Sequence, residues 1–211
     1  MPELPEVETI TRELCPRLVG RSITAVEVLW PNSIAVPDVP TFRREVIGLS
    51  ISEVSRRGKY IIFSADSFRH LLVHLRMTGQ LRLIPAPQDR HPHDRVCFSL
   101  DNGETLCFRD PRKLGRLWLV DDPQTVLGHL GPEPLNPALT PAEFAARLRQ
   151  HRGQLKPLLL NQRFLAGLGN IYTDEALFLS GLHPCRRAST LSEAEATRLL
   201  AAIREVLREA I

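Results

Sequence analysis

No apolar run in this 211-residue sequence approaches the length of a membrane-spanning helix, so an integral membrane protein is excluded at the level of sequence. The first twenty residues are acidic and interrupted by prolines, which is unlike a secretory signal peptide. Low-complexity segments and internal repeats are also missing. These absences predict a cytoplasmic protein that does not act at a membrane.

Cysteine is scarce, and no two cysteines stand close enough in sequence for a C-x-x-C metal knuckle. The four are Cys15, Cys97, Cys107 and Cys185. The histidines at 74, 91 and 93 form no recognisable ligand set either. We therefore expect free thiols in a reducing compartment and no metal or other cofactor within this chain.

Net charge is also small, because 27 Lys and Arg face 24 Asp and Glu, for a formal charge of +3. Bulk charge alone therefore does not indicate a nucleic-acid-binding protein. The distribution is uneven, since residues 147–211 hold ten Lys and Arg against six Asp and Glu. This local excess of four positive charges weakly favours an anionic partner for the C-terminal part.

The first half of the chain has the pattern of short, closely spaced strands. We expect them over 21–30, 59–66, 70–76, 79–84, 95–100, 104–110 and 115–120. Asn102-Gly103 predicts a hairpin with a type I′ turn, because both residues accept a positive φ. A helix from about Pro5 to Leu14 should precede the strands. The spacing is typical of an antiparallel sandwich or barrel.

The second half has helical signals. Residues 121–140 are rich in proline and glycine and are interpreted as a linker. Capping boxes at Thr140–Glu143 and Ser192–Glu195 predict helix starts, and a short helix could start at Lys156-Pro157. A further helix is expected over 170–180, closed by Gly181. We therefore predict an α+β multidomain protein, with a β domain over 1–120 and a helical domain over 141–211.

The start of the chain, MPELPEVETI, carries an unusual density of proline and glutamate. If Met1 is removed, Pro2 exposes a secondary amine, which is nucleophilic near neutral pH because α-amino groups have a pKa of about 7.7–8.0. Such an amine can attack a sugar C1′ and form an iminium ion, with Glu3 as acid or base. Alternatively, Met-Pro-Glu is a generic start, and Glu6 and Glu8 only favour a helix N-terminus.

Three short segments offer further candidates. Lys59 in RRGKY could supply a charge or a proton, or could simply begin a strand. Met77 in HLRMTG could wedge into a base stack, or could fill a core. Arg112, Lys113 and Leu114 in RDPRKLG could fill the hole left by an extruded base, or could form a solvated loop with one packed leucine.

The segment GLGNIYTDEALFLSGLHP (167–184) places two glycines before a helix. Backbone N–H groups near Gly167, Gly169 and Asn170 would suit a phosphate, because a helix N-terminus attracts anions. A plain helical hairpin is the alternative. A dinucleotide fingerprint is excluded, because a helix precedes the glycines and the third glycine is absent.

Taken together, these segments resemble the formamidopyrimidine-DNA glycosylases in order and spacing. They are PELPEVET, RRGKY, HLRMTG, DPRKLG, LGPEPL (130–135) and GLGNIYTDEALFLSGLHP. The resemblance extends from Met1 to the end of the chain. It implies an N-terminal catalytic β-sandwich followed by a helix–two-turn–helix DNA-binding domain. It also implies a monomeric, bifunctional glycosylase and AP lyase that excises oxidised purines from double-stranded damaged DNA.

The resemblance assigns roles to particular residues. Pro2 would be the Schiff-base nucleophile, Glu3 the acid that protonates the opening deoxyribose, and Lys59 a contact to the base or its phosphate. The remaining expected positions are Met77, Arg112 and Leu114 as void-filling residues, with Arg112 facing the orphaned cytosine; His93, Arg152, Lys156 and Asn170 as DNA-backbone contacts; and Glu6 and Glu175 as carboxylates that organise the amine and the helical turn.

Three departures from the family pattern are visible. Leu114 stands where the family usually has phenylalanine, and Lys113 where arginine is common. The family also carries a C-terminal finger in which four cysteines hold one structural zinc, whereas this sequence stops at Ile211. A fragment and a natural short form are both open. We expect this chain to bind damaged DNA weakly and to turn over poorly.

Two other functions fit the same sequence. An endonuclease VIII-type enzyme would act on oxidised pyrimidines, although Leu4-Pro5-Glu6-Val7 resembles the formamidopyrimidine enzymes more closely. A protein that retains the fold could instead bind damaged DNA without catalysis. A substrate panel distinguishes the first, and a comparison of DNA nicking by chains with and without Met1 tests the amine catalysis that the second lacks.

Overall fold

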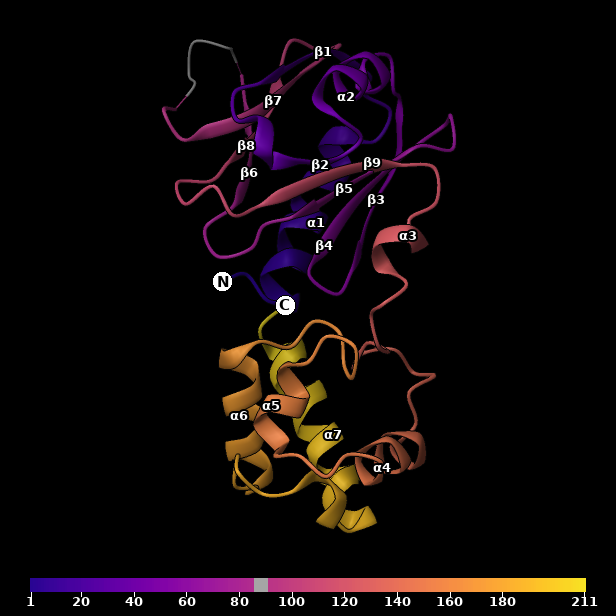
Figure 1. Cartoon of the computed structure of the whole chain (residues 1–211), viewed down its shortest axis with the longest axis vertical. Coiled ribbons are helices and arrows are strands. Elements are labelled where there is room, and N and C mark those ends of the chain that lie inside the picture. Colours follow the sequence, from indigo (N-terminus) through magenta and orange to yellow (C-terminus); the bar gives the residue numbers. More distant parts are fainter. Residues whose placement is uncertain (86–90) are drawn as a thin grey trace. The chain divides into compact units, whose positions relative to one another are not determined.

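A computed structural model describes residues 1–85 and 91–211. The described chain divides into two compact units, and its N-terminal segment contributes to both (Figure 1). Unit 1 consists of Met1–Pro2 and Val7–Gly128, and unit 2 of Glu3–Glu6 and His129–Ile211.

Unit 1 is built on two β-sheets. The first has the order β1 (Ile23–Val28), β7 (Asp94–Leu100), β8 (Thr105–Arg109) and β6 (Gln80–Ile84), with every neighbouring pair antiparallel. The second has the order β2 (Ile34–Val36), β9 (Arg116–Val120), β5 (His70–His74), β4 (Tyr60–Ala65) and β3 (Ile51–Arg57). The predicted α+β class is confirmed, and one detail differs, since β2 runs parallel to β9.

Helices α1 (Leu4–Leu18) and α2 (Val39–Val46) contribute to the core of unit 1. Helix α1 runs four residues beyond its predicted end, through Pro16, because Leu18 is completely buried in that core. Asp38 caps α2 by accepting a hydrogen bond from the Thr41 N–H at 3.0 Å. A 3₁₀ turn (η1, Pro31–Ser33) precedes β2, and a short helix α3 (Gln124–Leu127) lies in the segment that was interpreted as a linker.

The hairpin between β7 and β8 is confirmed, but its turn is not type I′. A type I′ turn needs positive φ at both central residues. Only Gly103 has one, at +86°, and its N–H donates to the carbonyl of Leu100 at 3.1 Å. The loop is therefore longer than the expected two residues, with a glycine bulge at its end.

The same hairpin corrects the expectation of four free thiols. Cys97 on β7 lies directly opposite Cys107 on β8, with Cα atoms 4.2 Å apart, and the two form a disulfide. Cys15 and Cys185 remain free. Two thiols are fewer than a four-cysteine zinc site requires, so the residues present do not fit that group.

Unit 2 is helical. Its elements are α4 (Pro141–Arg149), α5 (Leu155–Leu160), α6 (Asn170–Ser180), a 3₁₀ turn (η3, Ala188–Thr190) and α7 (Glu193–Glu209). Both predicted capping boxes are present, at the starts of α4 and α7. Gly181 ends α6 in the left-handed conformation at φ +66°, also as predicted. No helix that the described residues form is long and apolar enough to cross a membrane.

The core of unit 2 includes one residue from the start of the chain. Leu4 is fully buried among apolar side chains of α4 to α7, and its N–H donates to the carbonyl of Gly167 at 3.0 Å. The apolar stripe of α7, with Leu199 and Ile203, faces the same core. The N-terminal segment is thereby fixed to the loop before α6.

Candidate functional site

The carboxylate of Glu3 occupies the N-terminus of α6. Glu3 is only 2% exposed, and it accepts hydrogen bonds from the N–H groups of Gly169, Ile171 and Tyr172 at 2.6, 2.9 and 3.4 Å. The first N–H groups of a helix have no partner within the helix, and the helix dipole favours an anion there. The arrangement places a carboxylate, in a fixed orientation, directly after Pro2.

Two glycines before α6 make room for this segment. A Cβ atom at Gly169 would lie 2.4 Å from the carboxyl carbon of Glu3, and one at Gly167 would lie 2.6 Å from a methyl carbon of Leu4. Gly167 also has a φ of +106°, which side chains disfavour. Of the N–H groups that were expected to suit a phosphate, that of Gly169 donates to Glu3, and that of Gly167 donates to the Gln162 side chain at 2.9 Å. The side chain of Asn170 is exposed, and its proposed DNA contact stays a prediction.

Glu6 and Tyr172 complete the arrangement around Glu3. Glu6 accepts a hydrogen bond from the Glu3 N–H at 2.8 Å and another from the Tyr172 hydroxyl at 2.6 Å. Burial raises the pKa of Tyr172 above its ordinary value, and the hydrogen bond to Glu6 raises it further. The phenol therefore remains a donor at neutral pH. Glu175, the other expected carboxylate, is exposed on α6, and no hydrogen bond described in the structure joins it to Glu3 or Glu6.

The nucleophile and lysine candidates belong to unit 1. Pro2 is half-buried, and its nitrogen forms the peptide bond with Met1, so it becomes an amine only when Met1 is removed. Lys59 is 5% exposed and follows Gly58, which turns the chain between β3 and β4 at φ +58°. A buried cation is costly unless it is paired, and Lys59 does have an interaction partner.

A hollow of about 370 Å³ on unit 1 brings together Met77 and Leu114. Met77 lies in the turn between β5 and β6 (residues 75–79), which we call the Met77 turn. Leu114 lies in the turn between β8 and β9 (residues 110–115), which we call the Leu114 turn. They are 44% and 41% exposed and line the same hollow, so together they form an exposed apolar pair. The other lining residues are Met1, Arg76 and Arg116. Arg112, the third expected void-filling residue, is exposed in the Leu114 turn and does not line this hollow.

Sequence reasoning missed the residue that holds both turns. Asp110 is completely buried, and its carboxylate accepts hydrogen bonds from the Thr78 hydroxyl (2.5 Å) and the Leu114 N–H (2.6 Å). Burial alone would raise the pKa of Asp110, but hydrogen bonds from Gly115, Thr78, Leu114 and Arg112 outweigh it, and the pKa is lowered. An Asp-Pro pair before a basic turn was the available signal, because Asp often accepts hydrogen bonds from the N–H groups that follow it.

The expected DNA-backbone contacts divide between the units. In unit 1, His93 is exposed, and its ring lies 5.1 Å from that of His91. In unit 2, Arg152 is exposed, whereas the Lys156 ammonium forms an ion pair with Asp174 of α6 at 2.8 Å. Because both members of that pair are substantially solvent-exposed, a phosphate could displace Asp174 at small cost.

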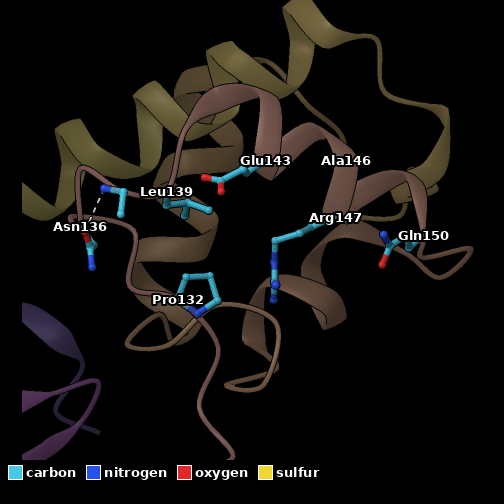
Figure 2. Close-up of a pocket in the computed structure, with 8 residues that line it drawn as sticks. Pro132, Asn136, Leu139, Glu143, Ala146, Arg147 and Gln150 are labelled. Carbon is cyan, nitrogen blue, oxygen red and sulfur yellow. Dashed lines mark hydrogen bonds between the residues drawn. The ribbon is translucent and has the colours of Figure 1, made fainter.

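A second hollow, of about 480 Å³, lies within unit 2 between α4 and the preceding loop. Figure 2 shows Arg147 extending from α4 into it, with Pro132 and Leu139 among its lining. The guanidinium lies 5.3 Å from the centre of the Phe164 ring and donates to the Phe164 carbonyl at 2.8 Å. Its Nε has no acceptor but is fully covered, so a ligand in the hollow could not reach it. Arg147 thus joins α4 to the loop after α5.

One group of potential metal ligands lies close together among the described residues, and it is already engaged. It consists of Asp94, Cys97 and Cys107. The two sulfur atoms are bonded to each other, and the Asp94 carboxylate forms an ion pair with Arg109 at 3.0 Å. This trio therefore has a structural role in the first sheet.

Comparison with known proteins gives consistent matches over both units. Residues 1–117 match the formamidopyrimidine-DNA glycosylase N-terminal domain, and residues 130–211 match the H2TH domain of the same family. A formamidopyrimidine-DNA glycosylase of Protochlamydia amoebophila is 44% identical over 212 residues, which covers 100% of this chain and 77% of that protein. One of Symbiobacterium thermophilum is 47% identical over 217 residues, covering 100% of this chain and 70% of that protein.

Solved structures agree with the sequence matches. The Lactococcus lactis formamidopyrimidine-DNA glycosylase, bound non-covalently to DNA with an AP site, has a TM-score of 0.93 at 37% identity. The comparison covers 99% of this chain and 81% of that one. The same bacterial protein with FAPY-dG-containing DNA also gives 0.93 at 37% identity, covering 99% and 80%.

Proposed function

Because the chain belongs to the formamidopyrimidine-DNA glycosylase family, we propose that it is a DNA glycosylase of base excision repair that removes oxidised purines from double-stranded DNA. The substrates would be 8-oxoguanine and formamidopyrimidines, and an AP-lyase activity would follow base removal. The observation that supports this most directly is the buried carboxylate of Glu3, held by three N–H groups next to Pro2. Acid–base catalysis requires such a positioned group.

The first chemical stage would use the amine of Pro2 after removal of Met1. The neutral nitrogen attacks C1′ of the damaged nucleotide, and the bond from C1′ to the base breaks. The nitrogen releases its proton to the Glu3 carboxylate, which passes it to the ring oxygen O4′ as the sugar opens, and the departing base takes a proton from water. The product is a cationic iminium ion between Pro2 and C1′, which is an electron sink.

The second stage would cleave the strand. The iminium ion acidifies the C2′–H bond, and loss of that proton expels the 3′ phosphate. A second elimination expels the 5′ phosphate, and hydrolysis returns Pro2 as a free amine. Lys59 would contact the lesion's base or phosphate and assist proton transfer.

The enzyme would reach C1′ by extruding the nucleotide, because this carbon is inaccessible in a stacked duplex. Met77, Arg112 and Leu114 would fill the space that the base leaves, and apolar wedges of this kind stabilise an unstacked step. Met77 and Leu114 line one hollow and are exposed, which supports their part of this role. The expected phosphate contacts are His93, Arg152, Lys156 and Asn170.

Borohydride trapping with an 8-oxoguanine:cytosine duplex tests the proposal. Two preparations are compared, one with Met1 removed and one in which Met1 is retained, with the masses verified. A covalent adduct is expected only when Pro2 is free, because the retained peptide bond removes the amine. Equal strand nicking by both forms would show that amine catalysis is wrong. Preference for a thymine glycol duplex would indicate an endonuclease VIII-type enzyme, and binding without an adduct would indicate a non-catalytic protein.

A further inference from the structure

The Met77 turn and the Leu114 turn are both held in conformations that are uncommon for residues other than glycine. Arg76 in the first has a φ of +56°, and Lys113 in the second has a φ of +58°. Non-glycine residues keep such angles only when the surrounding contacts impose them. The contacts around the two turns should therefore account for their shape.

Asp110 supplies several of these contacts. Oδ1 accepts the Thr78 hydroxyl at 2.5 Å and the Arg112 N–H at 3.2 Å. Oδ2 accepts the N–H groups of Leu114 and Gly115 at 2.6 and 2.7 Å. One fully buried carboxylate therefore binds three backbone groups of its own turn and the side chain of the neighbouring one.

The backbone of Asp110 extends the same network. Its carbonyl accepts a hydrogen bond from Arg95 Nε at 2.8 Å, and its N–H donates to the carbonyl of His93 at 3.0 Å. The Lys113 N–H also donates to the Asp110 carbonyl, at 3.2 Å. Both backbone groups of Asp110 are thus satisfied by the protein, and the residue is anchored to the strand that follows His93.

Two further contacts fix the Leu114 turn from outside. The Lys113 ammonium lies 3.9 Å from the centre of the Trp30 ring, which is a favourable cation–π distance. Arg116 donates through Nη1 to the carbonyl of Gly115 at 2.9 Å. At the end of the turn, a Cβ on Gly115 would lie 2.3 Å from the Phe108 ring, so glycine permits the close packing against β8.

We propose that Asp110 is a positioning residue that couples the Met77 turn to the Leu114 turn, so that both apolar tips are presented as one preformed wedge before DNA binds. This inference rests on the proposed function. A wedge that is already ordered loses little conformational entropy when it enters a base stack, and that favours insertion. Asp110 acts through Met77 and Leu114 and has no part in the chemistry at C1′. It should therefore matter only for substrates in which a base must be extruded.

The test compares two substrates with protein whose Met1 has been removed. One is an 8-oxoguanine:cytosine duplex, and the other is a single-stranded oligonucleotide with a preformed abasic site, which contains no base to extrude. In Asp110→Asn, an amide NH₂ replaces one acceptor oxygen, so either the Leu114 and Gly115 N–H groups or the Thr78 and Arg112 donors lose their partner. We expect adduct formation on the duplex to fall about tenfold to a hundredfold, with the single strand changed by less than about threefold.

Three further measurements make the comparison decisive. Thr78→Val removes only the bond between the two turns. It should lower adduct formation on the duplex more than on the single strand, as Asp110→Asn does, but by a smaller factor. If Asp110→Asn does not fold, the result for Thr78→Val tests the positioning role of Asp110 by itself. Asp101→Asn, in the exposed turn between β7 and β8, is the matched control and should change neither rate. A 2-aminopurine placed beside the lesion should report less unstacking in Asp110→Asn and Thr78→Val at saturating protein.

The two hypotheses fail in different ways. If the unaltered protein forms no adduct on either substrate, the proposed function is wrong. The positioning role of Asp110 is overturned if the unaltered protein forms both adducts and each variant, at Asp110 or at Thr78, lowers the duplex and single-strand adducts by the same factor. It is also overturned if the variants lower neither adduct.

Discussion

The carboxylate of Glu3 accepts a hydrogen bond from the backbone N–H of Gly169 at 2.6 Å, although the two residues are 166 positions apart in the sequence. The bond connects the residue after Pro2 to the first turn of α6. A helix N-terminus is a favourable place for a carboxylate, and here the anion comes from the protein itself. The helix thus orients the proposed catalytic group.

Gly169→Ala should disrupt this arrangement. Its Cβ would lie 2.4 Å from the Glu3 carboxyl carbon, a distance that only displacement of Glu3 can relieve. We expect the free energy of unfolding in urea to fall by about 1–3 kcal/mol, as in other overpacked sites. Adduct formation with an abasic oligonucleotide should fall as well, since the carboxylate would be misplaced.

Gly153→Ala is the matched control, because a Cβ there meets no atom within 4 Å and the glycine has no positive φ. It should leave adduct formation unchanged and alter the free energy of unfolding by less than about 1 kcal/mol. Equal effects of the two substitutions would contradict the close packing of Glu3 on Gly169.

Tyr172→Phe tests the second contact to the N-terminal segment. The substitution removes the hydroxyl that donates to Glu6 at 2.6 Å and leaves a partly buried carboxylate oxygen without that partner. We expect a loss of about 1–3 kcal/mol in the free energy of unfolding. A double-mutant cycle with Glu6→Ala should show non-additive losses, because each substitution removes the one bond that the two side chains share. Fully additive losses would mean that the bond contributes nothing.

The elements that the sequence predicts well are those with local signals. The capping boxes of α4 and α7 and the Gly181 terminus of α6 depend on residues within one turn of each other. The hairpin at Asn102-Gly103 is local in the same sense. By contrast, β3 was not predicted, because its buried Ile51 and Val54 are three residues apart and the pairing with β4 is irregular between Ile51 and Glu53, which removes the alternating pattern of a strand. Helix α2 was also missed, although Asp38 followed by Val39-Pro40-Thr41 is an N-terminal capping signal.

The same distinction between local and non-local signals applies to the candidate site. Pro2 and Glu3 were identified from their chemistry and from the family resemblance, because they are adjacent. The partners of Glu3 were not, since contacts between residues 3 and 169 depend on tertiary packing. Asp110 was seen only as part of a turn, because its bond to Thr78 crosses between two strand connections. Non-local hydrogen bonds of this kind leave no pattern in a single sequence.

The disulfide between Cys97 and Cys107 depends on the length of the hairpin loop. The expected two-residue turn at 102–103 would place position 97 opposite 108, whereas the loop of three residues at 101–103 places 97 opposite 107. Alkylation in denaturant without reductant should therefore label only Cys15 and Cys185, and prior reduction should expose all four thiols. Reduction should also lower the free energy of unfolding, by about 2–4 kcal/mol if this bond has a typical effect. Labelling of four thiols without reductant would show that the bond is absent.

Glu195 gives the protein an acid-dependent contribution to stability. Its hydrogen bonds with Arg186, and next with the Ser192 N–H, lower the pKa of Glu195 from 4.5 to about 2. A carboxylate whose pKa is lower in the folded state stabilises that state when ionised. The contribution is therefore fully present above about pH 4.5 and is lost as the pH falls toward 2.

Glu195→Gln should consequently lower the urea midpoint of unfolding at pH 6, and the difference from the unaltered protein should shrink as the pH falls from 4.5 toward 2. Glu205→Gln changes an exposed residue of the same helix and is the control. It should leave the urea midpoint almost unchanged at pH 6 and at pH 3. The size of the effect is limited by solvent, because Glu195 and Arg186 are both partly exposed. A difference between Glu195→Gln and the unaltered protein that stayed constant from pH 6 to pH 3 would show that the carboxylate contributes through its shape in the capping box and not through its charge.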